Sequence, residues 1–235
     1  MKNFSNGKKK AVTFSFDDGN VDDLRLMGIF NKYGLKCTFN LNSGKMLNNE
    51  FWTHKGKEVR HLNYIENEHA YDGHEIACHG YTHPHLEELN RADMLNQTAL
   101  DKKILSYLYD CDVKGMAYPY GSYNDDVIEV LKKCGIVYCR TVNSTHRYEL
   151  PQNLLLLDPT CHFKEDVTFE LAEKFVGLKP DSAKMLYIWG HSYELISEDD
   201  WQRFDDLCRL LSGHDDIWYA TNIEIAEDML PLKFY

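Results

Sequence analysis

The chain carries Ala11-Val12-Thr13-Phe14-Ser15-Phe16-Asp17-Asp18-Gly19, in which a short apolar segment runs directly into two carboxylates and a glycine. A segment rich in β-branched and aromatic side chains is typical of a buried strand. The glycine allows the backbone to turn immediately after the acids. Because α/β proteins carry their functional residues at the carboxyl ends of their strands, this pattern predicts a site at the end of the first strand.

Two later segments repeat this arrangement with histidines. His79-Gly80-Tyr81-Thr82-His83 follows a second expected strand and places two imidazoles four residues apart. Leu186-Tyr187-Ile188-Trp189-Gly190-His191 is a third apolar strand that ends on a histidine. Two acids and three histidines at strand ends indicate a metal-dependent hydrolase.

Strand-like and helix-like segments alternate along the whole chain. Periodicity and turn residues predict strands at 11–16, 35–41, 75–78, 113–118, 136–142, 154–157, 185–189 and 217–220. Helices are expected at 21–33, 86–108, 125–133, 167–176 and 199–211, with a terminal helix after the last strand. A helical or irregular stretch is expected around 57–68.

This alternation predicts an α/β fold, a (β/α) barrel of seven or eight parallel strands. The 235 residues suit one such barrel, so residues 1–235 are expected to form a single catalytic domain. An open doubly wound sheet is less favoured because no Gly-x-Gly-x-x-Gly follows the first strand.

Composition limits the partners and the compartment. A formal net charge of −11 disfavours nucleic acid and anionic membranes, so a small carbohydrate or amide substrate fits better. The apolar stretch after Lys8-Lys9-Lys10 is too short for a signal peptide or a membrane span. The 7 cysteines form no C-x-x-C pair, which favours a reduced, cytoplasmic location. The oligomeric state is left open.

Asp18, His79 and His83 form the expected ligand set of one divalent ion. A catalytic metal needs about three protein ligands and an open position, and nitrogen and oxygen donors suit Zn²⁺ and its neighbours. In a chain with 11 histidines the imidazole pair alone carries little weight. Its combination with the Asp-Asp strand end makes the prediction specific.

Four other histidines could compete for these roles. His74 precedes a strand and is expected at the opposite end of the barrel. His85 opens a helix, where a cap or a surface position is the usual place for such a residue. His146 and His162 follow later strands and are candidates for lining a substrate cleft.

The two adjacent acids admit a structural and a catalytic interpretation. Asp17 and Asp18 could serve as a turn acid and as the N-cap of the helix that begins near Val21. Two like charges side by side cost free energy unless a cation neutralises them or one of them is protonated. Their adjacency therefore favours a bound metal, with one carboxylate as a ligand and the other as a base.

These residues resemble the motifs of the polysaccharide deacetylase or NodB-homology superfamily, also called carbohydrate esterase family four. The first motif of that family, Thr-Phe-Asp-Asp-Gly, is similar to residues 15–19, and its His-x-x-x-His motif is similar to residues 73–84. The third and fifth motifs resemble Tyr118-Pro119-Tyr120-Gly121 and the apolar strand that ends at His191. The likeness runs from about residue 11 to residue 191 and implies a distorted (β/α) barrel.

The resemblance also implies a role for each matching residue. Asp17 would be the general base, Asp18, His79 and His83 the metal ligands, Tyr120 a backbone N–H donor to the oxyanion, and His191 the general acid. The family's third motif often begins with an arginine that orients the catalytic carboxylate, and Ala117 stands there instead. We hypothesise that Arg140, on the following strand, reaches the same carboxylate. The acid partner of His191 has no clear counterpart among residues 142–146.

We therefore expect a metal-dependent hydrolase that removes an N-acetyl or O-acetyl group from an amino sugar or oligosaccharide. Zn²⁺ is the favoured ion, with Co²⁺, Mn²⁺ and Ni²⁺ as alternatives. The second hypothesis is a cytoplasmic amidase acting on a cyclic imide, ureide or formamide. The third is a non-catalytic sugar-binding scaffold.

Aromatic residues and long loops are the candidates for shaping specificity. Trp189 is expected in the core, while Tyr193 and Trp201 are candidates for stacking on a sugar ring. The segments 42–72 and 143–153 lack periodicity and are the expected walls of the cleft.

Overall fold

The computed structural model describes residues 1–47 and 51–230. The parallel strands are β1 (Lys10–Asp17), β2 (Cys37–Leu41), β5 (Glu75–Cys78), β6 (Gly115–Ala117), β7 (Tyr138–Arg140), β8 (Cys161–His162), β9 (Lys184–Gly190) and β10 (Ile217–Tyr219). The helices are α1 (Asp23–Tyr33), α2 (Arg91–Leu108), α3 (Asp125–Lys133), α4 (Thr168–Gly177), α5 (Glu198–Leu211) and α6 (Asn222–Met229).

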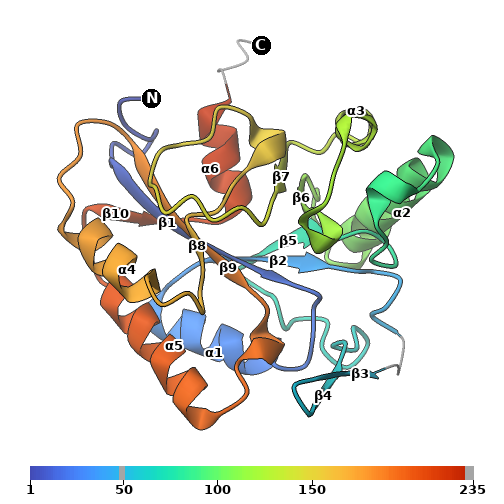
Figure 1. The fold of residues 1–235 in the computed structure, drawn as a ribbon, viewed down its shortest axis with the longest axis horizontal. Coiled ribbons are helices and arrows are strands. Elements are labelled where there is room, and N and C mark those ends of the chain that lie inside the picture. The colour runs from blue at the N-terminus through green and yellow to red at the C-terminus, as the bar shows by residue number, and fades with distance from the viewer. Residues whose placement is uncertain (48–50, 231–235) are drawn as a thin grey trace.

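These eight strands form one curled parallel sheet. Its order is β7-β6-β5-β2-β1-β9-β8, and β10 pairs with β1 outside this path. Figure 1 shows the helices arranged around the sheet, with α1, α4 and α5 together on one side and α2 and α3 on another. The predicted distorted barrel of seven or eight parallel strands is confirmed. No helix in the described part of the chain has the length and apolarity needed to cross a membrane.

Strand β1 occupies the centre of the sheet and brings distant segments together. One of its edges pairs with β9 from Lys10 to Phe16, and the other pairs first with β10 and then with β2. Phe16 lies opposite Gly190, and Asp17 lies opposite Asn40. The carboxyl ends of β1, β2 and β9 therefore share one rim, and the loops that follow them meet there.

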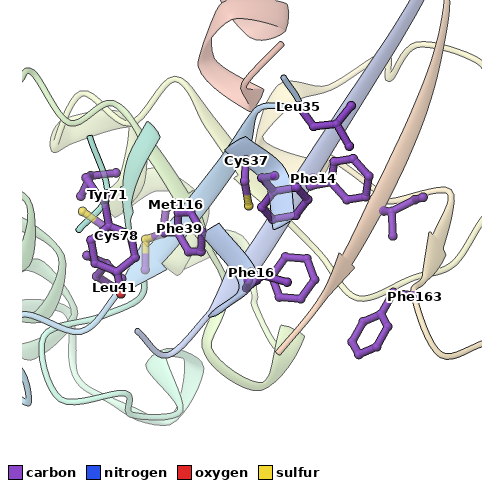
Figure 2. Close-up of a cluster of buried hydrophobic side chains, with 14 of the residues drawn as sticks. Phe14, Phe16, Leu35, Cys37, Phe39, Leu41, Tyr71, Cys78, Met116 and Phe163 are labelled. Atoms are coloured by element: carbon purple, nitrogen blue, oxygen red, sulfur yellow. The ribbon is translucent and has the colours of Figure 1, made fainter. Parts of the chain in front are cut away.

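The side chains of β1 alternate between an apolar outer face and a polar interior. Phe14 and Phe16 pack outward against phenylalanines of α1 and α5 at centroid distances of 4.9–6.3 Å, within the cluster of Figure 2. Each fully buried ring contributes about 1.5–3 kcal/mol relative to exposure. Ser15 and Asp17 face the interior, where Asn40 donates hydrogen bonds to both. Packing on the outer face thus fixes the position of a carboxylate on the inner one.

The chain around Leu157 closes the gap between β7 and β8. Leu157 forms a parallel bridge with Arg140, its N–H donates to the carbonyl of Cys139, and its carbonyl accepts from Thr141. The barrel is therefore distorted here, with single bridging residues in place of a regular strand pair.

One predicted strand is wrong, and one predicted irregular stretch is correct only in part. Residues 154–157 were expected as a strand, but Leu154–Leu156 forms a 3-10 turn capped by the side chain of Asn153. A run of four leucines has no period that separates strand from helix, and the neighbouring strand β8 has only two residues. Of the stretch expected as helical or irregular around 57–68, residues 61–68 are irregular, but residues 57–60 form β4 (Lys57–Arg60), which pairs with β3 (Phe51–His54) in a hairpin.

Candidate active site

The three predicted metal ligands converge at the rim of the barrel. The Nε2 atoms of His79 and His83 are 3.1 Å apart. They lie 3.6 and 3.5 Å, respectively, from Oδ1 of Asp18. Donors that bind one tetrahedral Zn²⁺ at about 2.0–2.2 Å lie about 3.3 Å from one another. The spacing of these three atoms therefore fits a single small divalent ion.

A hydrogen bond on the far side of the ring orients His79. Its Nδ1 lies 2.9 Å from the carbonyl oxygen of Ala117, and a carbonyl can only accept, so Nδ1 carries the proton. The lone pair of Nε2 is then directed toward Asp18 and His83. Outer contacts of this kind fix the tautomer that metal binding requires. The backbone at position 117 thus supports the site even though its side chain is only a methyl group.

Asp18 and His83 are held in unusual backbone conformations. Their φ angles are 74° and 59°, in the left-handed region, where such residues cost of order 1–3 kcal/mol and occur mostly at functional sites. The N–H of Asp18 donates to the carbonyl of Asn40 at 3.0 Å, and Nδ1 of His61 donates to the Asp18 carbonyl at 2.8 Å. Burial and the neighbouring His79 lower the pKa of His83 to about 4, so its imidazole is neutral and able to bind a metal.

Asp17 lies beside these ligands and is fully buried. Asn40 donates to its Oδ1 at 2.8 Å, and the guanidinium of Arg140 donates to its Oδ2. Burial alone would raise the pKa of this carboxyl, but neighbouring positive charges, Arg140 first among them, hold the pKa below its ordinary value. Arg140 is itself buried and lies over the ring of Trp189, 4.4 Å from its centroid. The arginine from β7 thus makes the contact that the sequence hypothesis required.

Arg140→Met is expected to destabilise the protein by about 3–5 kcal/mol, because it leaves Asp17 as an unpaired buried charge. Turnover should fall as well, since the carboxylate loses the donor that fixes Oδ2. Denaturant unfolding and acyl-hydrolysis rates measure the two effects. The double variant Asp17→Asn/Arg140→Met should regain most of the stability and none of the activity. Unchanged turnover in the single variant would show that Arg140 does not support Asp17 in catalysis.

His191 presents one ring nitrogen to the site. Its Nε2 lies 3.9 Å from Oδ2 of both Asp17 and Asp18, and its Nδ1 lies 3.3 Å from Oε2 of Glu194. An ionised carboxylate only accepts, so Nδ1 carries a proton and Nε2 is the atom available for chemistry. Burial would lower the pKa of His191, but Glu194 and the two aspartates outweigh it and raise the pKa to about 9.

Glu194 is the acid partner of His191, and the sequence motifs did not predict it. Its Oε2 accepts from Nε2 of His162 at 2.8 Å and from the backbone N–H of His191 at 3.1 Å. Nδ1 of His162 accepts from the N–H of Lys164 at 3.2 Å, so Nε2 of His162 holds the proton that it donates. Burial would raise the pKa of Glu194, but the two imidazoles lower it below the ordinary range. The available signal was an acid three residues after His191, which is the spacing of a capping box.

Glu194→Gln is expected to lower kcat by about 10–100-fold while the metal content stays unchanged, because His191 loses orientation but no ligand is removed. Steady-state kinetics and metal analysis of the purified variant check this. Glu198→Gln is the matched control, since Glu198 is exposed and pairs with Arg25 on the surface. Equal activities of the two variants would show that Glu194 does not support His191.

A cavity of about 510 Å³ opens over these residues. Besides the five acids and histidines, Tyr118, Tyr120, Val142, Trp189 and Tyr193 line it. Tyr120 has a φ of 58° and its side chain is 56% exposed. Gly121 follows with a φ of 72°, and a Cβ there would come within 2.4 Å of Val142. The turn of residues 118–121 therefore requires glycine and holds Tyr120 against the site.

The remaining histidines lie outside the group of ligands. His74 accepts the N–H of Cys37 at the start of β2, at the opposite end of the barrel, as expected. His85 is exposed, and its ring stacks on Tyr120 at a centroid distance of 3.9 Å. His146 and His162 pair with glutamates and do not line the cavity.

Only some of the expected aromatic residues and loop segments lie at the catalytic cavity. Trp189 and Tyr193 both line the cavity, so Trp189 is more than a core residue. Trp201 is buried in the core and lies outside the cavity. No described residue of the segment 42–72 lines this cavity, but Lys45, Phe51, Trp52 and His61 line an adjoining one that shares Asp18, His83 and Tyr120 with it. Residues 143–153, all of which the structure describes, line neither cavity.

Comparison with known proteins now identifies the family. Residues 4–139 match the model of the family described as polysaccharide deacetylase. The chain belongs to the polysaccharide deacetylase family. The match covers the first two motifs and the turn of residues 118–121, so the resemblance to carbohydrate esterase family four is confirmed.

Two curated relatives each match about half of this polysaccharide deacetylase. The Bacillus subtilis protein YxkH, named for polysaccharide deacetylases, is 25% identical over 132 residues, which cover 54% of this chain and 43% of that protein. A bifunctional xylanase/deacetylase of Pseudobutyrivibrio xylanivorans is 26% identical over 122 residues, covering 52% and 18% of the two chains. The matched region thus spans less than half the length of either relative.

Solved structures support the fold over nearly the whole chain. A polysaccharide deacetylase structure from Mycobacterium smegmatis matches with a TM-score of 0.64 at 19% identity and covers 95% of this chain and 91% of that one. A family 4 carbohydrate esterase from Streptomyces lividans, in complex with acetate, matches with a TM-score of 0.58 at 16% identity, covering 91% and 93%. At these identities the likeness extends to the fold alone.

Proposed function

We propose that this family member is a metal-dependent hydrolase that removes an N-acetyl or O-acetyl group from an amino sugar or oligosaccharide. The observation that carries the proposal is the convergence of Asp18, His79 and His83 beside Asp17 and His191 in one cavity. The proposal treats residues 1–235 as one catalytic domain, because β1 pairs with β9 and β10 from the far end of the chain.

The residues fit one divalent ion, with Zn²⁺ favoured and Co²⁺, Mn²⁺ and Ni²⁺ as alternatives. Two imidazoles and a carboxylate are the donors that such ions bind. Burial would raise the pKa of Asp18, but nearby histidines, the protonated His191 first among them, keep this pKa below its ordinary value, so the carboxylate is ionised. When bound, the ion would polarise the acyl carbonyl and lower the pKa of a water molecule.

Asp17 would act as the general base. Its depressed pKa keeps it ionised throughout the neutral range, and Asn40 and Arg140 hold both of its oxygens in place. The carboxylate takes a proton from the attacking water as the tetrahedral intermediate forms. A positioned base of this kind typically raises the reaction rate by about 10²–10⁴-fold.

His191 would act as the general acid. Its proton on Nδ1 is engaged by Glu194, so a second proton on Nε2 is the one that it can transfer. With a pKa of about 9, the ring is doubly protonated at neutral pH. Nε2 then donates to the nitrogen of the departing amine, or to the oxygen of a departing alcohol, as the acyl bond breaks.

Tyr120 would supply a backbone N–H to the developing oxyanion. Its left-handed conformation and the turn around Gly121 set the direction of this peptide beside the cavity. In other enzymes, removing one such donor lowers kcat by about 10²–10³-fold.

Acetate release from N-acetylated chito-oligosaccharides by the Zn²⁺-loaded protein tests the proposal. Release that stops on chelation and returns with added metal is the expected result. Turnover of a cyclic imide, ureide or formamide without acetate release from any glycan would support the amidase reading. Sugar binding without turnover of any amide or of a generic acetyl ester would support a scaffold.

A further inference from the structure

A second cavity of about 350 Å³ adjoins the catalytic one beneath the β3–β4 hairpin. Asp18, His83 and Tyr120 line both cavities, so the two form one continuous cleft with Tyr120 between them. Lys45 and Phe51 line only the second cavity. A group bound there would lie next to the bond that the catalytic residues act on.

The hairpin is fixed relative to the active site. The ring of Trp52 packs against His61 at 4.9 Å and against Tyr193 at 5.4 Å, centroid to centroid. The N–H of Val21 donates to the carbonyl of Arg60, which ties the end of β4 to the loop after β1. These contacts hold the wall of the second cavity that Phe51 and Trp52 form against the active site.

Two large aromatic side chains are exposed at this cavity. Phe51 and Tyr120 are 57% and 56% exposed. Both rings are therefore open to contact with a ligand. Tyr120 is backed by the stacked ring of His85, and Phe51 lies under the guanidinium of Arg60 at 5.3 Å. Rings held in this way offer flat apolar surfaces to a ligand. The C–H face of a sugar is a ligand of matching shape and polarity.

The charge of the cleft selects among such sugars. Lys45 is the one lysine or arginine among the described residues that line either cavity. The chain as a whole carries a net charge of −11, which repels anions at long range. Asp18 also lines the second cavity, but its Oδ1 lies 3.6 and 3.5 Å from Nε2 of His79 and His83. Lys45 therefore offers a cation that can pair with a carboxylate on the ligand.

We propose that the second cavity binds a carboxylate-bearing sugar that adjoins the acetylated sugar, with Lys45 pairing its carboxylate and Phe51 packing on its ring. The inference rests on the proposed deacetylation at the neighbouring catalytic cavity. The preferred substrate is then an acidic oligosaccharide rather than a single amino sugar.

Dissociation constants in the metal-loaded Asp17→Asn background test this without turnover. The probes are N-acetylchitotetraose, which is neutral, and a hyaluronan tetrasaccharide, in which a uronic acid adjoins N-acetylglucosamine. Lys45→Met should weaken binding of the acidic probe about tenfold and change that of the neutral probe less than about twofold. Phe51→Ala should weaken both about fivefold. The matched controls are Lys103→Met and Tyr107→Ala, two exposed positions on α2.

Failure of the inference is distinct from failure of the proposed function. Equal effects of Lys45→Met on both probes, or no binding of the acidic probe, would overturn the inference even if acetate is released. Lys45-dependent binding of the acidic probe to a protein that releases no acetate would uphold the subsite and overturn the deacetylation.

Discussion

Replacing Asp17 with asparagine is expected to lower kcat by about 10³-fold, within the range for loss of a positioned base, while the protein keeps its metal. Asparagine has nearly the same shape and can still accept from Arg140, but its amide cannot take a proton from water. Since Asp17 is not one of the three converging ligands, the affinity for the ion should change little.

Kinetics of the Zn²⁺-loaded variant and elemental analysis after dialysis measure the two quantities. A fall in kcat without a fall in metal content is the informative result, because most damage to a metal site lowers both kcat and metal content. Loss of metal from Asp17→Asn would make this carboxylate a ligand, and full activity would assign the base elsewhere.

The second large effect is expected for His79→Gln, which should abolish both metal binding and turnover. The imidazole is 2% exposed, and its Nε2 lies within 3.6 Å of both partner donors, so no surface residue can take its place. Removing one of three ligands should lower the affinity for the ion by more than about 10³-fold, and activity should fall with it.

His85→Gln is the matched control for this loss. His85 lies six residues further on, is exposed, and belongs to a separate group with Glu87 and Glu88. Titration with Zn²⁺ should give one tight site in this variant and none in His79→Gln. Tight binding retained by His79→Gln, or lost from His85→Gln, would move the metal centre to other residues.

The positions of the main site residues could be predicted because they follow strands. Asp18 and His191 come directly after β1 and β9, which pair in parallel register, and His79 follows β5. Parallel strands place their carboxyl ends on one rim, so the residues that directly follow them lie close together irrespective of the loop conformations. Arg140 could be proposed for the same reason, since it ends β7.

The parts that escaped prediction depend on turns and on tertiary packing. Glu194 reaches His191 only because residues 192–194 form a 3-10 turn that brings an acid back onto the ring three positions earlier. The hairpin that shapes the second cavity turns at Lys55 and Gly56, both with positive φ, in a segment without clear periodicity. Leu157 enters the sheet as a single bridging residue, a placement that no local pattern of leucines specifies.

Anomalous diffraction at the zinc edge from crystals of the Zn²⁺-loaded protein would locate the bound ion. We expect one strong peak about 2.0–2.2 Å from a carboxylate oxygen of Asp18 and from Nε2 of His79 and His83, with Asp17 unligated beside it. The donors of His162, His191 and Glu194 also lie within 4.8 Å of one another. A single peak among those three residues, or no peak at the rim of the barrel, would show that Asp18, His79 and His83 do not hold the ion.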